Sequence, residues 1–218
     1  MRTGFTSAAT TFFAQLEGDN TREFWLTHRG TYDEVLRPVF LQLTSALGGQ
    51  WRVYRPHNDT RFGKAAPYKT FLGAVSETAD GIGTFLQVSP SGLLVGTGIP
   101  VPAPDQLTRL RDGLGGVAGE RFVEASGEVT AAGGRVHGGR YPPLKRVPRG
   151  WSVDHPRADW LRWKGVEVNH RPGSPPWLDT AEAPERVRAL IAVGDPVHRW
   201  LADHVGPSAL SPQERFGR

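Results

Sequence analysis

The sequence predicts an α+β fold, in which a helical N-terminal segment packs on an antiparallel or mixed central sheet and helices return towards the C-terminus. Three observations indicate this. Apolar residues recur at helical spacing in the first third of the chain, strand-like runs bounded by turn residues occupy the middle, and helical spacing returns near the end. Because helices and strands are segregated rather than alternating, the pattern favours α+β over a βαβ arrangement.

The N-terminal third is expected to form helices. The residues Phe5, Ala9, Phe12 and Leu16 recur three to four positions apart. Asn20 with Glu23 fits a capping box, which predicts a second helix from about Thr21. A further apolar stripe runs over residues 32–47. Pro38 is expected to kink or restart that helix, and the glycine pair at 48–49 to end it.

The middle of the chain is expected to form strands. The predicted strands are Arg52–Pro56, Lys69–Val75, Thr84–Val88 and Leu93–Thr97. The last two are joined by residues 89–92, where an early proline and a late glycine suit a type I turn closed by a left-handed Gly92. These strands are almost continuously apolar, so both faces of the sheet are expected to be partly covered.

Further elements follow after Pro104. Helices are predicted around Leu107–Leu114 and Phe122–Val129, and then a glycine- and proline-rich loop over residues 133–148 with room for one strand. Asp154 is a candidate N-cap of a short helix that carries apolar Trp160.

The last part of the chain is expected to hold one strand and two helices. Val166 and Val168 alternate with polar residues and predict the strand. Val187 and Ile191 indicate a helix, and Asp195-Pro196 is typical of the cap and first residue of the last one.

Several classes of site and location are disfavoured by composition. The chain has no cysteine, which excludes disulfides, thiolate metal sites and a cysteine nucleophile. The sequence has no apolar run that resembles a signal peptide or a membrane span, so we expect a cytoplasmic protein without a membrane partner. No dinucleotide fingerprint, P-loop or HExxH motif occurs, and the histidines have no metal-site spacing. We therefore expect neither a cofactor nor a metal.

Positive charge is concentrated in two segments. The whole chain carries +4, but residues 52–69 alone carry +4 and residues 135–171 carry +6, which leaves −6 for the remainder. If the two segments meet in the fold, they form one surface that attracts anions. If they do not meet, they are two solvated basic loops.

The first basic segment holds the densest group of chemically capable side chains. If it is extended, Arg55, His57, Asp59 and Arg61 project to one side, because strand side chains alternate. Two arginine forks with an aspartate between them suit an incoming anion, and His57 and Asp59 are the candidate catalytic residues. The alternative is an internal Arg–Asp pair that fixes a loop to the sheet. Pro56 indicates an edge or loop rather than a regular strand.

Four more residues are candidate ligand-binding groups. Tyr68 offers a hydroxyl and Lys69 a point charge, although on a strand the two point in opposite directions. In the second basic segment, Lys145 and Arg149 flank a stiff proline turn, and Arg149 could stand beside the Trp151 ring.

These motifs together resemble the family of uncharacterised bacterial proteins called DUF2461. The resemblance rests on four blocks in order: Asn20–Trp25 with His28, Arg29 and Tyr32; Asp59–Phe62 with Pro67–Lys69; the 85–98 hairpin; and Leu144–Pro156. It spans nearly the whole chain and implies one domain over residues 1–218, but it implies no activity. The acidic step that such proteins carry between the Arg-Phe and Pro-Tyr-Lys motifs is missing here.

Three functions are compatible with the sequence. The leading hypothesis is a protein that binds a small anionic ligand, with enzymatic activity undecided. A nucleic-acid-binding module is less favoured, because the net charge is modest and no nucleic-acid-binding signature is present. The third is a protein-interaction domain in which the motifs are purely structural, and it predicts that Asp59 and Arg61 are buried together.

Overall fold

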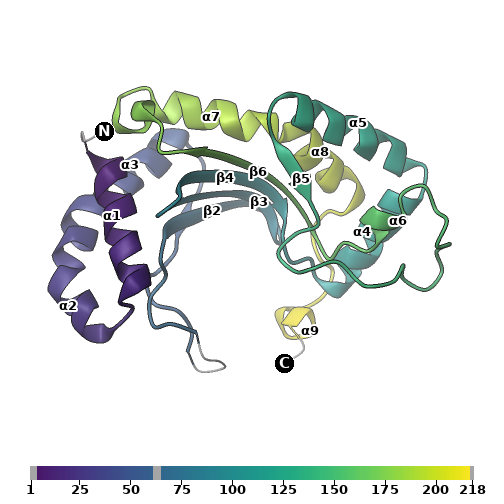
Figure 1. The fold of residues 1–218 in the computed structure, drawn as a ribbon. Helices are drawn as coiled ribbons and strands as arrows, with labels where there is room; N and C mark the ends of the chain where they lie inside the picture. The colour runs from purple at the N-terminus through teal and green to yellow at the C-terminus, as the bar shows by residue number, and fades with distance from the viewer. Residues whose placement is uncertain (1–3, 61–64, 217–218) are drawn as a thin grey trace. The chain divides into compact units, whose positions relative to one another are not determined.

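The computed structural model describes residues 4–60 and 65–216 and confirms the α+β class (Figure 1). Its helices are α1 Phe5–Gly18, α2 Arg22–Gly30, α3 Arg37–Leu47, α4 Pro104–Gly115, α5 Ala118–Ala131, α6 Ala158–Leu161, α7 Ala183–Val193, α8 Asp195–His204 and α9 Pro212–Phe216, with a π-helical turn η1 at Thr31–Leu36 and a 3-10 turn η2 at Pro176–Asp179. Its strands are β1 Arg52–Val53, β2 Leu72–Ala79, β3 Ile82–Ser89, β4 Gly92–Ile99, β5 Arg135–His137 and β6 Val166–Gly173.

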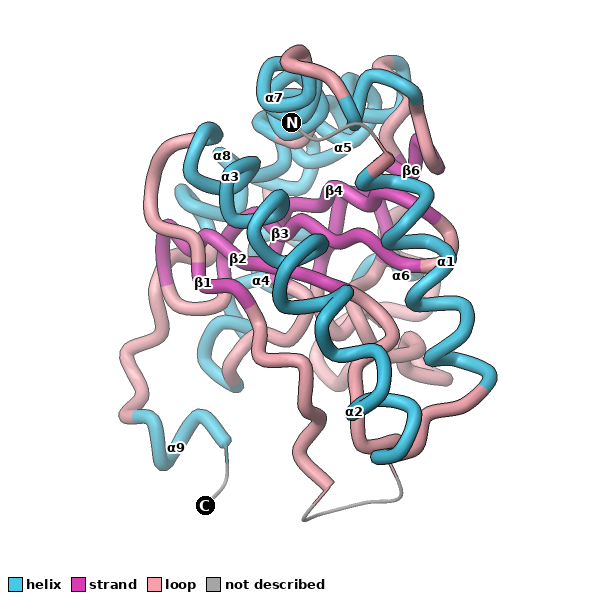
Figure 2. The backbone as a smooth tube through the Cα atoms, turned by 90° about the vertical axis from the view of Figure 1, so that its left-hand side faces the viewer, coloured by secondary structure: helices cyan, strands magenta, loops and turns pink. Residues whose placement is uncertain are grey.

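The six strands form an antiparallel sheet in the order β1-β2-β3-β4-β6-β5. Figure 2 shows β1 to β4 side by side. Gly92 has φ +86°, as the turn between β3 and β4 requires, and every residue of β4 is buried, as expected of a covered strand. The first predicted strand is much shorter than expected. Pro56 has no N–H to donate, so after β1 the pairing continues only as an isolated bridge between His57 and Tyr68.

Contacts between residues divide the chain into two compact units. Unit 1 comprises residues 1–76, 85–95 and 171–190, and unit 2 comprises residues 77–84, 96–170 and 191–218. In unit 1, α1, α2 and α3 lie together (Figure 1) and pack with η1. Aromatic side chains form the core of this packing. Phe12 contacts Phe13, Trp25 and Tyr32, with ring centroids 5.2–6.2 Å apart. This core holds α2 and η1 in fixed positions.

The turn η1 arises where Pro38 interrupts the helical hydrogen bonds. The N–H of Arg37 donates to the carbonyl of Tyr32, five residues back, and Pro38 has no N–H to continue the series. The prediction that Pro38 restarts the helix is therefore confirmed, since α3 begins at Arg37. Single π-turns within helices are frequent at functional sites.

Unit 2 is built around α4, α5 and α8, with Phe122 in van der Waals contact with Trp160 and Trp200 in the core. Two predicted caps are wrong in this unit. Asp195 is the first residue of α8 and Gly194 its N-cap, while α6 is preceded by Arg157 and not by Asp154. The segment before α6 instead reaches back to the end of α4.

Arg157 accounts for that arrangement. Its guanidinium donates to the carbonyls of Leu114 and Gly116, 2.5 and 2.8 Å away, and forms an ion pair with Glu120. The imidazole of His155 donates from Nε2 to the Gly115 carbonyl at 3.1 Å and accepts the Arg157 N–H at Nδ1. These groups satisfy the last carbonyls of α4, which have no partners within the helix.

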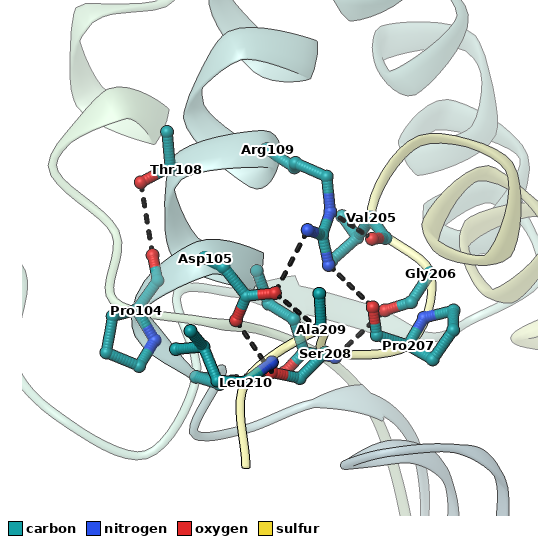
Figure 3. A network of polar contacts seen from close by, with 12 residues as sticks. Pro104, Asp105, Thr108, Arg109, Val205, Gly206, Pro207, Ser208, Ala209 and Leu210 are labelled. Carbon is teal, nitrogen blue, oxygen red and sulfur yellow. Dashed lines mark hydrogen bonds and ion pairs between the residues drawn. The ribbon is translucent and has the colours of Figure 1, made fainter. Parts of the chain in front are cut away.

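A second network fastens the C-terminal segment to α4 (Figure 3). Asp105 accepts hydrogen bonds from the Ser208 hydroxyl at 2.7 Å, the Ala209 N–H at 2.9 Å and Arg109 at 3.0 Å. Arg109 also donates to the carbonyls of Val205 and Pro207. Although desolvation alone would raise it, the pKa of Asp105 is lowered because these donors favour the carboxylate.

We expect this network to weaken in acid. A carboxyl with a lowered pKa in the folded state stabilises the protein above its unfolded pKa of about 4, and the stabilisation is lost progressively as the pH falls below that value. Asp105→Asn should therefore lower the free energy of unfolding by about 1–2 kcal/mol at pH 7 and by less at pH 3, where part of the stabilisation is already lost. Urea unfolding at both values measures this, with exposed Glu124→Gln as the control. An equal loss at the two pH values would contradict it.

Among residues 4–60 and 65–216, no helix combines the length and apolar character needed to cross a lipid bilayer.

Candidate functional site

A cavity of about 370 Å³ lies in unit 1, beside one face of the continuous helical segment from α2 to α3. The helical side of its lining consists of Arg22, Trp25, Leu26, Arg29, Tyr32, Asp33 and Arg37. They fall at positions 22, 25–26, 29, 32–33 and 37, so each group follows the last by three or four residues and all share one face of the helical segment. The opposite wall is formed by two extended segments, residues 54–58 and 67–69, which the His57–Tyr68 bridge joins into a ribbon. This ribbon contributes Pro56, His57 and Tyr68 to the lining.

Aromatic rings form the inner wall of this arginine-lined cavity. The Tyr68 ring stacks on the Trp25 ring at 4.5 Å between centroids and 11° between planes. The ring centroids of Trp25 and Tyr32 are 5.1 Å apart. The His57 ring packs edge-on against Trp25 and is tilted against Tyr68. Trp25, Tyr32 and Tyr68 are almost fully buried, so their positions are fixed by packing.

Charge in the cavity is predominantly positive. Three arginines and one aspartate line it. Arg29 donates from Nε to Asp33 at 2.6 Å, so one cation and the one anion are paired. Within the described part of the chain, the guanidinium groups of Arg22 and Arg37 take part in no hydrogen bond or ion pair. Two arginine forks are thus available to a bound group.

Tyr32 adds a neutral hydrogen-bond donor. Burial raises its pKa to about 12, with the Asp33 carboxylate adding to the rise and Arg37 opposing it. The phenol therefore remains protonated throughout the physiological range. A protonated hydroxyl beside arginine side chains can donate to an anion without bringing charge of its own.

Asn20 aligns the ribbon wall with the helical wall. Its side chain does not cap α2, contrary to the predicted capping box; the N-cap is Thr21, whose hydroxyl accepts the Phe24 N–H. Asn20 instead pairs with the backbone of Tyr68 in both directions, donating to its carbonyl at 3.0 Å and accepting its N–H at 2.9 Å. An asparagine amide can do this because it mimics a backbone peptide group.

Asn20→Ala should therefore release Tyr68 from the cavity wall. Loss of two partly buried hydrogen bonds is expected to cost about 2 kcal/mol of unfolding free energy. Denaturant unfolding followed by tryptophan fluorescence measures it, with Asn58→Ala as the control, because the Asn58 side chain makes an exposed hydrogen bond to the Ala66 carbonyl. Equal losses in the two variants would show that Asn20 has no special role.

The sequence-predicted site residues are only partly brought together. His57 and Tyr68 line the cavity. Arg55, His57 and Asp59 are exposed while Pro56 and Asn58 are half-buried, which is the alternation expected of an extended segment. Arg61 lies outside the described residues. The exposed Asp59 does not fit the purely structural interpretation, which requires it to be buried.

The remaining candidates lie elsewhere. Lys69 belongs to the ribbon and is half-buried, and its Nζ donates to the carbonyl of His57 at 2.5 Å. Lys145 and Arg149 are exposed and belong to unit 2, so the prediction that the two basic segments share one surface stays a prediction. The Trp151 ring covers Gly115, where an added Cβ would lie 2.1 Å from the ring. Its expected place beside Arg149 stays a prediction.

Sequence reasoning missed the arginines of the helical wall. Arg22, Arg29 and Arg37 are spaced seven and eight residues apart, which is two helical turns each time, and this recurrence was the available signal. No group of three histidine or acidic side chains suited to a metal ion occurs among residues 4–60 and 65–216.

The fold and the cavity define an α+β protein with a basic, aromatic-walled cavity at its N-terminal helices. The chain matches the family described as "Conserved hypothetical protein (DUF2461)" over residues 8–200, and it belongs to that family. This match confirms the resemblance seen in the motifs. No curated protein and no solved structure matches the chain.

Proposed function

We propose that this protein binds a small anionic molecule in the arginine-lined cavity. The observation that carries the proposal is that Arg22 and Arg37 line the cavity without a partner among the described residues, while the one lining carboxylate is already paired with Arg29. Arginine forks match carboxylate and phosphate oxygens in pairs. The volume of about 370 Å³ suits a small metabolite and lies at the lower end for ligand sites.

Each wall has a distinct role in this proposal. Arg22 and Arg37 hold the anion, Tyr32 donates a hydrogen bond, and the buried Trp25 and Tyr68 rings keep the wall rigid. If the protein is an enzyme, His57 is the candidate to exchange a proton with the bound molecule. Arg55, Arg61, Lys69, Lys145 and Arg149 also remain proposed ligand-binding residues, because their side chains can donate hydrogen bonds to an anion.

A thermal-shift screen of phosphorylated and carboxylated metabolites tests the proposal. At least one compound should raise the melting temperature in a concentration-dependent way, because a ligand that binds only the folded state stabilises it. Tyr32→Phe should weaken the binding of that compound about tenfold, since a hydrogen bond to a charged group contributes about 1.5–3 kcal/mol. Phenylalanine keeps the ring in the core, so stability should change little. No stabilisation by any anion would overturn the proposal.

Nucleic-acid binding is the alternative, and the packing gives it less support. Trp160 and Trp163 are half-buried against the unit 2 core, and Trp151 covers the end of α4, so these rings are not free platforms for bases. Binding of mixed oligonucleotides at several salt concentrations distinguishes the two functions. A steep salt dependence would favour nucleic acid, and weak binding with a shallow slope would remove it.

A further inference from the structure

Lys69 lies in an unusual electrostatic setting. Its N–H donates to the Pro56 carbonyl at 2.7 Å and the His57–Tyr68 bridge fixes the register, so Lys69 stands opposite Pro56 and next to Arg55 and His57. Its side chain is half-buried, and Nζ donates to the His57 carbonyl at 2.5 Å. Along the described chain, Lys69 forms no ion pair with a carboxylate.

This setting disfavours the ammonium form of the side chain. A carbonyl holds the amine in place but carries no charge to compensate an ammonium. Burial, and to a lesser extent the Arg55 cation, lower the pKa of Lys69. The same two causes, burial and a cationic neighbour, activate lysines that attack carbonyl groups. The His57 carbonyl can accept one N–H while the nitrogen lone pair stays available.

We infer that Lys69 is a nucleophilic lysine that condenses with small carbonyl compounds, such as aldehydes and α-keto acids, to form an imine. The Nζ lone pair attacks the carbonyl carbon and an amine proton passes to the carbonyl oxygen, which gives a carbinolamine. Loss of water then leaves the C=N bond. Arg55, beside the amine, would favour carbonyl compounds that also carry an anionic group. The inference does not rest on the arginine-lined cavity, because its evidence lies in the ribbon alone.

The lysines of the chain provide an internal comparison. The sequence has four, at positions 64, 69, 145 and 164. Lys145 is exposed, whereas Lys69 is half-buried. If access alone governed reaction, Lys145 would react faster. Faster reaction at Lys69 would therefore report activation of its amine and not exposure.

Reductive trapping tests the inference on the full chain. The protein is treated at pH 7 with pyridoxal 5′-phosphate, an anionic aldehyde, or with formaldehyde, an uncharged one. Sodium borohydride or cyanoborohydride then reduces the imine to a stable amine, and peptide mass spectrometry gives the rate at each lysine. We expect Lys69 to react roughly threefold or more faster than Lys145 with both probes, and the preference to be larger with the anionic one.

Two variants show whether Arg55 contributes to the reactivity of the Lys69 amine. Arg55→Gln should reduce the rate at Lys69, whereas Arg146→Gln, next to Lys145, should leave the rate at Lys69 unchanged. Circular dichroism confirms that both variants are folded. Equal or faster reaction at Lys145 with both probes would overturn the inference. A preference for Lys69 that persists when cavity binding is abolished by the double variant Arg22→Gln/Arg37→Gln would support it and would leave the anion site to be judged separately.

Discussion

Gly98→Ala is expected to cause the largest loss of stability of any single methyl group added to unit 2. Gly98 has φ +139°, a conformation that residues with a Cβ rarely adopt. A Cβ built there would lie 2.2 Å from the Val166 carbonyl oxygen and 3.0 Å from the Glu167 Cα. Both neighbours are backbone atoms of the adjacent strand β6, so no side-chain rotation relieves the overlap.

Backbone strain and overpacking each cost about 1–3 kcal/mol, so the variant should lose about 3–5 kcal/mol of unfolding free energy. Urea unfolding measures this directly. The matched control is Gly127→Ala in α5, where an added Cβ meets nothing within 4 Å and the backbone is helical. That control should gain about 0.5–1 kcal/mol, because alanine is the better helix former. A Gly98→Ala variant as stable as the control would contradict the β4–β6 pairing.

The largest functional effect is expected from removing the two unpaired arginines of the cavity. Arg22→Gln and Arg37→Gln each remove one guanidinium that has no hydrogen bond or ion pair within residues 4–60 and 65–216. Each substitution should weaken the binding of the anion found in the screen by about tenfold or more, since a hydrogen bond to a charged group contributes about 1.5–3 kcal/mol. The double variant should retain no measurable affinity.

Both side chains are exposed, so their loss should change the melting temperature little. Isothermal titration calorimetry measures the affinities. Arg121→Gln is the control, because Arg121 is an exposed arginine on α5 in unit 2. Equal affinities in the control and in the double variant would place the binding site elsewhere. Aggregation of the double variant would be recognised from its circular dichroism and separated from a loss of binding.

Elements set by local pattern were predictable from the sequence. The spacing of Leu107, Leu110 and Leu114 after Pro104 gave α4, and the Pro90–Gly92 turn gave the β3–β4 hairpin. These features depend on residues close together in the chain, where helical periodicity and turn chemistry act directly.

Features set by distant contacts were not predictable. Asn20 looked like a helix cap, but its amide pairs with the Tyr68 backbone 48 residues away. Asp154 looked like a cap as well, whereas His155 and Arg157 reach back about forty residues to the end of α4. A polar side chain that satisfies a remote backbone has the same composition as one that caps its own helix, so only the fold distinguishes them.

The sequence indicated one of the two walls of the candidate site. His57 and Tyr68 lie in the polar tract that the sequence singled out, and both line the cavity. The arginines of the helical wall are spread over sixteen residues and carry no local density of charge. Local charge density therefore indicated the ribbon wall of the cavity but not the helical wall. The signal for the helical wall was the spacing of Arg22, Arg29 and Arg37 by two helical turns.

A crystal structure of the protein with selenate shows whether a small anion binds between Arg22, Arg37 and Tyr32. Selenate has the shape and charge of sulfate, and its anomalous scattering locates the bound ion without ambiguity. We expect an anomalous peak inside the arginine-lined cavity, within hydrogen-bonding distance of at least one of the two guanidinium groups. A cavity without a peak, in crystals where selenate is bound at Lys145 or Arg149, would contradict it.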